Sequence, residues 1–278
     1  RHFPPFQERH MQIERFSVRH QPNVALDRAR PYGAAEAAVL NETALEAARA
    51  EIAAWPGYAA TPLVSLDGLA GTLGLASLGY KDEARRFTLK SFKALGGAYA
   101  VLCVLQDHIE AATGKRPTAS ELTAGAHREL VSQVTVASAT DGNHGRSVAW
   151  GAEMFGCRCV IYLHEHVSET REAEIARYGA EIRRVSGGYD DSVRQCAKDA
   201  QENGWQLVAD TSLGGDNRIP SLVMQGYTIL TDELMAQCDA MPTHIFVPGA
   251  VGGLAAAIVG PLWERLGADR PRVVVVEP

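Results

Sequence analysis

The amino-acid sequence predicts an α/β fold with mostly parallel sheets. From residue 134 onward, strand-like apolar runs alternate with helical patterns, and polar or glycine-rich loops follow several of these strands. Strands that alternate with helices form right-handed βαβ units, whose strands lie parallel in one sheet. The 278 residues suffice for one large domain or two ordinary ones, and a composition of 46% hydrophobic and 22% charged residues is normal for a soluble globular protein.

The first part of the chain is polar and rich in helix-forming residues. The clearest helix is predicted over 40–55, with Asn41 as its cap. An extended segment opens at Thr61, and the short apolar run over 75–80 predicts a strand. A second long helix is predicted over 91–108, because apolar residues recur there at helical spacing.

The regular alternation begins after this second helix. Strands are predicted over 134–139, 159–163, 181–185, 206–209, 244–247 and 273–276. Helices are predicted over 145–155, 168–178, 190–203, 219–238 and 254–266. The uncharged stretch over 245–263 has the length of a membrane span, but Pro248 and the glycines that follow it favour a buried strand, a tight loop and a buried helix.

Charge and cysteine usage indicate a cytoplasmic protein without a polyanionic partner. The net charge is -6, so neither nucleic acid nor an acidic membrane surface is expected to bind. The five cysteines form no Cys-x-x-Cys pair, which favours reduced thiols over a metal site. Residues 1–30 contain no apolar stretch of the kind found in signal peptides. The chain begins at Arg1 and stops after a core strand, so we expect the gene product to be longer.

Three loops follow predicted strands and are candidates for one ligand site. They are 140–143, 210–211 and 249–253. Ligands of parallel α/β sheets bind beyond the carboxyl ends of the strands, where all three loops are expected to lie.

Lys93 is the candidate for covalent chemistry. An imine-forming lysine needs an amine that can be held neutral in a pocket that restricts water. Lys93 lies between Phe92 and Ala94 at the start of a helix, and Gly96-Gly97 permits close approach of another backbone. The alternative is an ordinary surface lysine at a helix end.

The loop Asp141-Gly142-Asn143-His144-Gly145 joins a strand to a helix. Its backbone N–H groups can bind an anion such as a carboxylate, and the Asn143 amide can bond a phenolic oxygen. A simple Asp-Gly turn with Asn143 as helix cap is the alternative. His144 is expected to be a structural or stacking residue of this loop rather than a metal ligand, because no second histidine stands at ligand spacing.

The glycine loop over 249–254 could belong to a dinucleotide-binding unit, since Glu277 ends the next strand where a ribose-binding acid would stand. However, Gly-Ala-Val-Gly-Gly is not Gly-x-Gly-x-x-Gly, and a loop that offers several N–H groups to one phosphate monoester fits better. Asp210-Thr211 is either a turn cap or part of the site.

Several motifs together resemble the fold-type II pyridoxal phosphate (PLP) enzymes, a family that includes serine/threonine dehydratases and the tryptophan synthase β chain. Within it, the resemblance is strongest to the diaminopropionate ammonia-lyases. It extends over about residues 55–278. The motifs are Pro56-Gly57-Tyr58, Thr61-Pro62-Leu63, Tyr80-Lys81-Asp82-Glu83, Arg86-Phe87, Phe92-Lys93 with Leu95-Gly96-Gly97, Ala139 to Arg146, Asp210-Thr211 and Met224-Gln225-Gly226-Tyr227.

This resemblance implies two three-layer α/β domains with mostly parallel sheets and the cofactor in the cleft between them. The large PLP-binding domain would comprise 1–97 and 209–278, with its C-terminal part missing, and the small domain 98–208. The implied reaction is α,β-elimination of D- and L-2,3-diaminopropionate to pyruvate and two ammonia. A homodimer is also implied, and the residue that bonds the pyridine nitrogen would lie beyond Pro278.

The resemblance also implies a role for each site residue. Lys93 would carry the cofactor and act as base for the L isomer, Asp141 would be the base for the D isomer, and Asp210 would bind or orient the β-amine. Asn143 would bond the ring oxygen. The phosphate would be held by Ala250, Val251, Gly252, Gly253 and Leu254. The substrate would meet Thr140, Asp141, Gly142, His144 and Asp210.

Asp141 is a departure from the dehydratases, whose corresponding loop is usually neutral. At about 4 Å and an effective dielectric of about 20, a carboxylate attracts an ammonium by on the order of 4 kcal/mol before desolvation. A substrate with a second amino group is therefore favoured over serine. A serine/threonine dehydratase of the same fold and a non-catalytic PLP-binding relative remain the alternatives.

Overall fold

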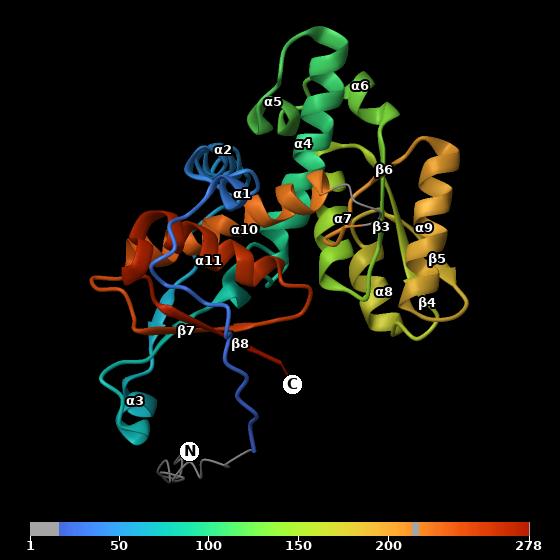
Figure 1. Ribbon diagram of the computed structural model, residues 1–278. Coiled ribbons are helices and arrows are strands. Elements are labelled where there is room, and N and C mark those ends of the chain that lie inside the picture. Colours follow the sequence, from blue (N-terminus) through green and yellow to red (C-terminus); the bar gives the residue numbers. More distant parts are fainter. Residues whose placement is uncertain (1–16, 213–216, 278) are drawn as a thin grey trace, which may run out of the picture.

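The computed structural model describes residues 17–212 and 217–277, and these residues adopt an α/β fold in two parts (Figure 1). One part is built on a four-stranded sheet, the other on the two-stranded sheet of β7 (His244–Pro248) and β8 (Arg272–Val276). Both sheets are parallel, as the alternation of strands and helices predicts.

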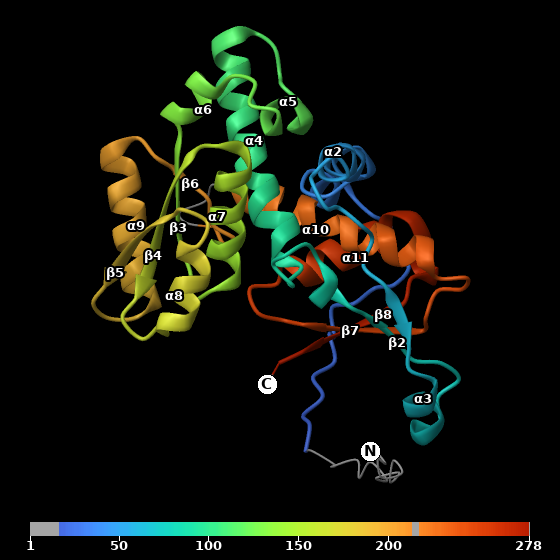
Figure 2. The ribbon, with the colours of Figure 1, turned by 180° about the vertical axis from the view of Figure 1, so that it is seen from behind.

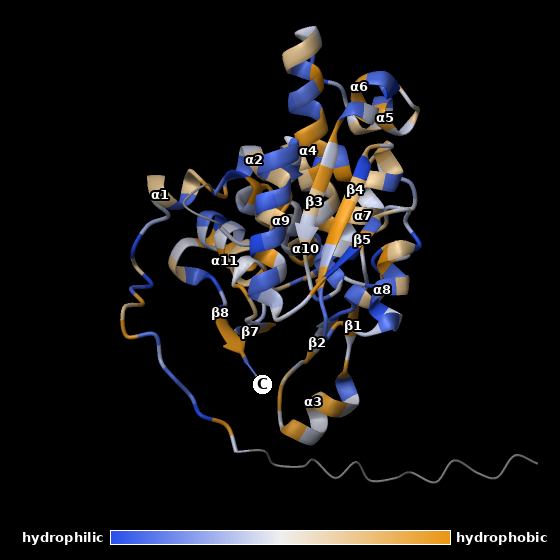
Figure 3. Ribbon diagram, turned by 90° about the vertical axis from the view of Figure 1, so that its right-hand side faces the viewer, coloured by the Kyte–Doolittle hydropathy of each residue, from blue (hydrophilic) through white to orange (hydrophobic). Residues whose placement is uncertain are grey.

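The four-stranded sheet has the order β5-β4-β3-β6. Its strands are β3 (Thr135–Ala139), β4 (Arg158–His164), β5 (Glu181–Val185) and β6 (Gln206–Leu207). The central strands β3 and β4 are almost continuously buried, which explains the apolar run of β4 and the small side chains of β3 (Figure 3). The carboxyl ends of β3 and β6 lie at the same edge, so the loops after Ala139 and Leu207 are neighbours.

Helices cover both faces of this sheet and make it the middle of three layers (Figure 1). Ile161 faces the core that it shares with α7 (Asn143–Phe155) and α8 (Glu169–Ala176), whereas its neighbour Val160 packs against α9 (Tyr189–Asn203). Successive side chains of a strand point to opposite faces, so one apolar strand supplies both cores.

The other part packs α10 (Arg218–Gln237), α11 (Gly253–Leu266) and α2 (Glu42–Ile52) together above β7 and β8. The stretch over 244–266 forms a strand, a loop and a helix, which confirms that prediction. No helix of the described residues is long and apolar enough to cross a membrane.

The long helix α4 (Lys93–Thr113) runs between the two parts and contacts both α7 and α10 (Figure 2). Glycines allow these close approaches. A Cβ on Gly96 would lie 2.7 Å from the Val223 carbonyl oxygen of α10, and one on Gly97 would lie 2.6 Å from Ser147 Oγ of α7. The start of α4, and with it Lys93, is therefore held by helices of both parts.

The remaining elements are short. They are α1 (Ala34–Ala37), β1 (Leu63–Ser65), α3 (Asp67–Leu73), β2 (Gly79–Lys81), η1 (Glu83–Arg85), α5 (Ala119–Thr123), α6 (Arg128–Gln133) and η2 (Gly267–Asp269). The strand expected over 75–80 is wrong over most of its length, because α3 ends in left-handed Gly74 and β2 pairs with β1 only from Gly79. The two domain ranges, 1–97 with 209–278 and 98–208, remain a prediction.

A buried ion-pair network joins the segment before α4 to α10. Arg86 is fully buried and donates two hydrogen bonds of 2.7 Å to Glu233. It also pairs with Glu83 at 2.8 Å, and Lys81 pairs with Glu233 at 2.8 Å. Because each buried charge has an opposite partner, the network fixes the chain that leads into Lys93.

Candidate active site

Lys93 and Asp210 form an ion pair between the two parts of the molecule. Lys93 is the first residue of α4, and Asp210 follows the last described strand of the four-stranded sheet. Lys93 Nζ lies 2.7 Å from Asp210 Oδ2, and the two side chains are only 18% and 14% exposed. Burial by itself would raise the pKa of the Asp210 carboxyl, but its electrostatic interactions with the neighbouring His144 and Lys93 side chains outweigh burial, so the pKa is lowered.

His144 lies beside this pair and is buried. Its Nδ1 is 3.9 Å from Asp210 Oδ2, and its Nε2 is 3.0 Å from the carbonyl oxygen of Val208. Burial lowers the pKa of His144, and the Lys93 charge lowers it further, although Asp210 opposes this. The ring is therefore uncharged at neutral pH, and Lys93 supplies the positive charge that Asp210 meets.

The Thr140 side chain shapes the loop Asp141-Gly142-Asn143-His144-Gly145, which is called the asparagine loop below. Thr140 Oγ1 accepts hydrogen bonds from the backbone N–H groups of Gly142 and Gly145, at 3.0 and 3.1 Å. A Cβ on Gly145 would lie 3.0 Å from Thr140 Cβ, so the loop closes tightly onto the start of α7. Asn143 opens α7 and is exposed, two residues earlier than the predicted helix start.

Asp141 does not share the contacts of Lys93. Its side chain is 58% exposed, and in the described chain its ion pair is with His164 Nε2 at 3.0 Å. The pKa of Tyr189, at the start of α9, is raised to about 12 by burial and by the charges of Asp210 and Asp141.

The glycine loop forms a tight turn before α11. Gly252 donates a backbone hydrogen bond of 3.0 Å to Gly249, and both Ala250 and Gly252 have positive φ, at 46° and 85°. Val251 at its tip is 54% exposed. The first N–H groups of α11, at Gly253 and beyond, have no helical acceptor, so they are available to an anion.

Tyr227 of α10 links the glycine loop to Lys93. Lys93 Nζ lies 5.7 Å from the centre of its ring, and the ring lies close to Gly253 and Gly96. Tyr227 is 2% exposed, and its hydroxyl has no hydrogen-bond partner in the described residues. Sequence reasoning assigned no role to Tyr227 or Tyr189, although Tyr227 stands in the quoted motif Met224 to Tyr227.

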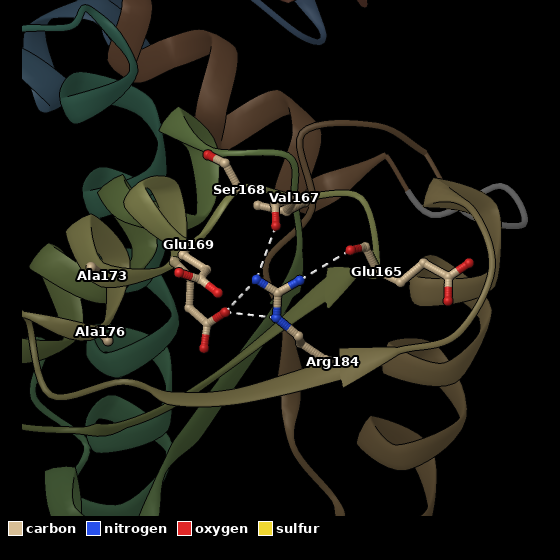
Figure 4. Close-up of a pocket in the computed structure, with 8 residues that line it drawn as sticks. Glu165, Val167, Ser168, Glu169, Ala173, Ala176 and Arg184 are labelled. Atoms are coloured by element: carbon tan, nitrogen blue, oxygen red, sulfur yellow. Dashed lines mark hydrogen bonds and ion pairs between the residues drawn. The ribbon is translucent and has the colours of Figure 1, made fainter.

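Two cavities flank α8. One of about 320 Å³ is lined by Asp141, Gly142 and Asn143 together with Arg146 and residues of α8. A larger one of about 640 Å³ contains none of the predicted site residues (Figure 4). Its Arg184 already donates to Glu172, Glu165 and Val167. The asparagine loop thus lines the smaller cavity, whereas the Arg184 guanidinium of the larger cavity is already bonded to neighbouring protein groups.

The residues fit pyridoxal phosphate. The cofactor requires a lysine amine, a cradle for a phosphate monoester and hydrogen-bonding groups around its ring. Lys93 and the turn before α11 supply the first two, with Tyr227 packed between them. A Cβ at Gly249 would lie 2.7 Å from Glu277 Cδ, so glycine lets this turn pass close to the Glu277 side chain. No group of three or more metal-ligating side chains occurs among the described residues.

The fold and this site define a PLP-dependent enzyme. Residues 54–278 match the family described as "Pyridoxal-phosphate dependent enzyme", and the chain belongs to that family. The predicted fold class and cofactor are thereby confirmed.

The chain is similar to the diaminopropionate ammonia-lyases of Salmonella typhimurium and Escherichia coli K12. It is 39% and 38% identical to them over 80% of its own length and over 56% and 55% of theirs. A probable D-serine dehydratase of an Acidovorax species is 26% identical over 81% of this chain and 52% of that protein. The chain thus spans just over half the length of these relatives.

The chain is also similar to solved structures of a diaminopropionate ammonia lyase. The crystal structure of diaminopropionate ammonia lyase from Escherichia coli in complex with D-serine matches with a TM-score of 0.79 and 35% identity, over 86% of this chain and 61% of that one. A second structure of that enzyme, in complex with an aminoacrylate-PLP azomethine reaction intermediate, matches with a TM-score of 0.77 and 34% identity, over 86% and 60%.

Proposed function

We propose that this protein catalyses the PLP-dependent α,β-elimination of 2,3-diaminopropionate, in both stereoisomers, to pyruvate and two ammonia. The observation that carries the proposal is the Lys93–Asp210 pair, in which a lysine able to hold the cofactor lies against a carboxylate able to hold an ammonium. The similarity to diaminopropionate ammonia-lyases over 80% of the chain supports the same activity.

The bound cofactor would withdraw electrons from the substrate Cα, which makes its proton acidic. Lys93 Nζ would take the Cα proton of the L isomer. Asp141, on the loop after β3, would take that of the D isomer. The resemblance implies that these two bases act on opposite faces of the substrate. The backbone N–H groups of Asn143 and His144, at the start of α7, would bind the substrate carboxylate.

Asp210 would hold the second amino group of the substrate as an ammonium. Loss of that group leaves the electron pair of the Cβ–N bond on nitrogen, so an ammonium departs as neutral ammonia without needing a further proton. An ionised Asp210 carboxylate would favour the cationic form of this amino group.

A substrate panel tests the proposal. The full-length holoenzyme is given D- and L-2,3-diaminopropionate, D- and L-serine and L-threonine, and release of pyruvate, 2-oxobutanoate and ammonia is measured. We expect both diaminopropionate isomers to be the best substrates, with two ammonia released for each pyruvate. A higher kcat/KM on serine or threonine would contradict the proposal.

A serine/threonine dehydratase is the second candidate, supported by the similarity to a probable D-serine dehydratase. The acidic residue Asp141 in the substrate loop disfavours it, because a neutral β-hydroxyl gains little from a second carboxylate. A cofactor-binding protein without turnover is the third candidate, and pyruvate release from any of the amino acids would exclude it.

We propose further that the protein is a homodimer in the cytoplasm. The fold-type II resemblance and the scattered thiols, for which no disulfide is found among the described residues, support this. Light scattering on the full-length protein should give the mass of a dimer, and a monomeric mass would contradict that state.

A further inference from the structure

The hydrogen bond of His144 fixes which of its ring nitrogens carries the proton. Nε2 lies 3.0 Å from the backbone oxygen of Val208. A carbonyl oxygen only accepts hydrogen bonds, so Nε2 must donate. In the uncharged ring, the other nitrogen, Nδ1, is then a bare acceptor.

That acceptor is buried and unused. His144 is 5% exposed, and its Nδ1 has no hydrogen-bond partner among the residues that the structure describes. Asp210 Oδ2, which is also an acceptor, lies 3.9 Å from it. Two acceptors cannot bond each other, and a buried polar atom without a partner is costly, so a donor placed between the two would satisfy both.

The structure already shows what kind of donor Asp210 takes. The primary ammonium of Lys93 lies 2.7 Å from its Oδ2. A lysine that is bonded to the cofactor cannot also serve Asp210 as an ammonium. Asp210 and His144 Nδ1 are then two acceptors without a cation, and one nitrogen can lie within hydrogen-bond distance of two acceptors that are 3.9 Å apart.

We propose that His144, through its Nδ1 lone pair, is the second acceptor for the β-ammonium of the substrate and selects diamino acids over hydroxy amino acids. This rests on the proposed function. An ammonium has three hydrogens and can donate to Asp210 and His144 together. The hydroxyl of serine has one hydrogen and can donate to only one of them. His144 therefore distinguishes the two kinds of substrate by how many hydrogens the group on Cβ can donate, and not by the charge of that group.

Two substitutions separate the nitrogens. In His144→Gln, the amide stands where Nε2 stood and can still donate to Val208, but the acceptor at Nδ1 is removed. In His144→Asn, the amide oxygen can replace Nδ1, while the bond to Val208 is lost. His108→Gln, an exposed position on α4, is the matched control. For each full-length holoenzyme, kcat/KM is measured on 2,3-diaminopropionate and on serine of the same chirality.

We expect the ratio of the two kcat/KM values to fall at least about tenfold in His144→Gln, to fall less in His144→Asn, and to stay unchanged in His108→Gln. An unchanged ratio in His144→Gln would overturn the inference while the proposed function stands. A wild-type enzyme without turnover of diaminopropionate would instead overturn the proposed function and, with it, the substrate role of His144.

The protonation state gives a readout that does not depend on activity. In ¹⁵N-histidine-labelled wild-type holoenzyme at neutral pH, we expect one ring with an unprotonated Nδ1 and a protonated Nε2, whose signals are absent from His144→Gln. If His144→Gln does not fold, His144→Asn serves for the assignment. A protonated Nδ1 on this ring would overturn the inference.

Discussion

Lys93 Nζ and Asp210 Oδ2 lie 2.7 Å apart although 117 residues separate them in the chain. One is held by a helix that contacts both parts of the molecule, the other by a loop at the carboxyl edge of the four-stranded sheet. The pair thus brings the lysine proposed to hold the cofactor and the carboxylate proposed to bind an ammonium to one place, and most of the predicted chemistry depends on it.

Replacement of Lys93 should abolish covalent attachment of the cofactor. In Lys93→Ala and Lys93→Arg, we expect loss of the visible absorption of the bound cofactor and of all turnover. Lys93→Arg keeps the charge opposite Asp210, so its loss of absorption would reflect the missing amine and not a broken ion pair. Lys198→Ala, in an exposed pair on α9, is the control and should retain both properties.

Asp141→Asn should impair the D isomer far more than the L isomer. The substitution removes the carboxylate that would accept the D proton and leaves Lys93 in place. A positioned general base contributes about 10²- to 10⁴-fold, so kcat on D-2,3-diaminopropionate should fall by that order. Equal losses on both isomers would show that Asp141 binds substrate without acting as an isomer-specific base. Glu165→Gln, on an exposed neighbouring loop, should affect neither.

Glu233→Gln should destabilise the fold strongly. Arg86 is fully buried and donates hydrogen bonds of 2.7 Å to both carboxylate oxygens of Glu233, so the substitution removes the charge that Arg86 meets there. We expect the free energy of unfolding, measured in urea, to fall by about 3–5 kcal/mol. Glu202→Gln removes an exposed partner of Lys198 and should cost less than about 1 kcal/mol. Equal losses would mean that the buried network adds nothing.

Stability should decline in two steps as the pH falls. Burial lowers the pKa of His144 below its ordinary 6.5, so below that pH the unfolded chain binds more protons than the folded one. Burial would raise the pKa of Glu233, but its bonds to Arg86 and its pair with Lys81 lower it below 4.5. The contribution of ionised Glu233 to stability is therefore complete above pH 4.5 and is lost as the pH falls through its lowered pKa.

Urea unfolding at a series of pH values measures both steps. His144→Gln should flatten the upper step, and His108→Gln should leave it unchanged. If the free energy of unfolding increased as the pH is lowered from 6.5 to 5, this would contradict the lowered pKa of His144.

Gly96→Ala should destabilise the fold and disturb Lys93. The added methyl group would lie 2.7 Å from the Val223 carbonyl oxygen and would meet the ring of Tyr227, so α10 must move. Overpacking of this kind costs about 1–3 kcal/mol. Gly71→Ala in α3 adds the same methyl group with nothing within 4 Å, and should stabilise its helix by about 0.5–1 kcal/mol. A neutral Gly96→Ala would show that the helices can separate at no cost.

Much of the fold was predictable because its signals are local. The periodicity of apolar residues identified strands such as β5 (Glu181–Val185) to the residue, and α10 and α11 to within one. The strand predicted over 75–80 is wrong over most of its length, because β2 is defined by its pairing with β1 and not by its own hydrophobicity. Loops at strand ends, and Lys93 at a helix start, could likewise be found in the sequence.

The sequence by itself determined the alternation of strands and helices and the cofactor class, and it predicted Lys93 as the lysine that holds the cofactor, since each depends on residues that are close together in the chain. Only the tertiary structure decided that Asp210 pairs with Lys93, that the Val208 carbonyl holds the proton of His144 on Nε2, and that Tyr227 lies between Lys93 and the glycine loop. The contacts of Lys93 with Asp210 and Tyr227, and of His144 with Val208, join residues 64 to 134 positions apart, and they depend on how closely glycines let α4 approach α7 and α10. No periodicity or spacing along the chain encodes that distance.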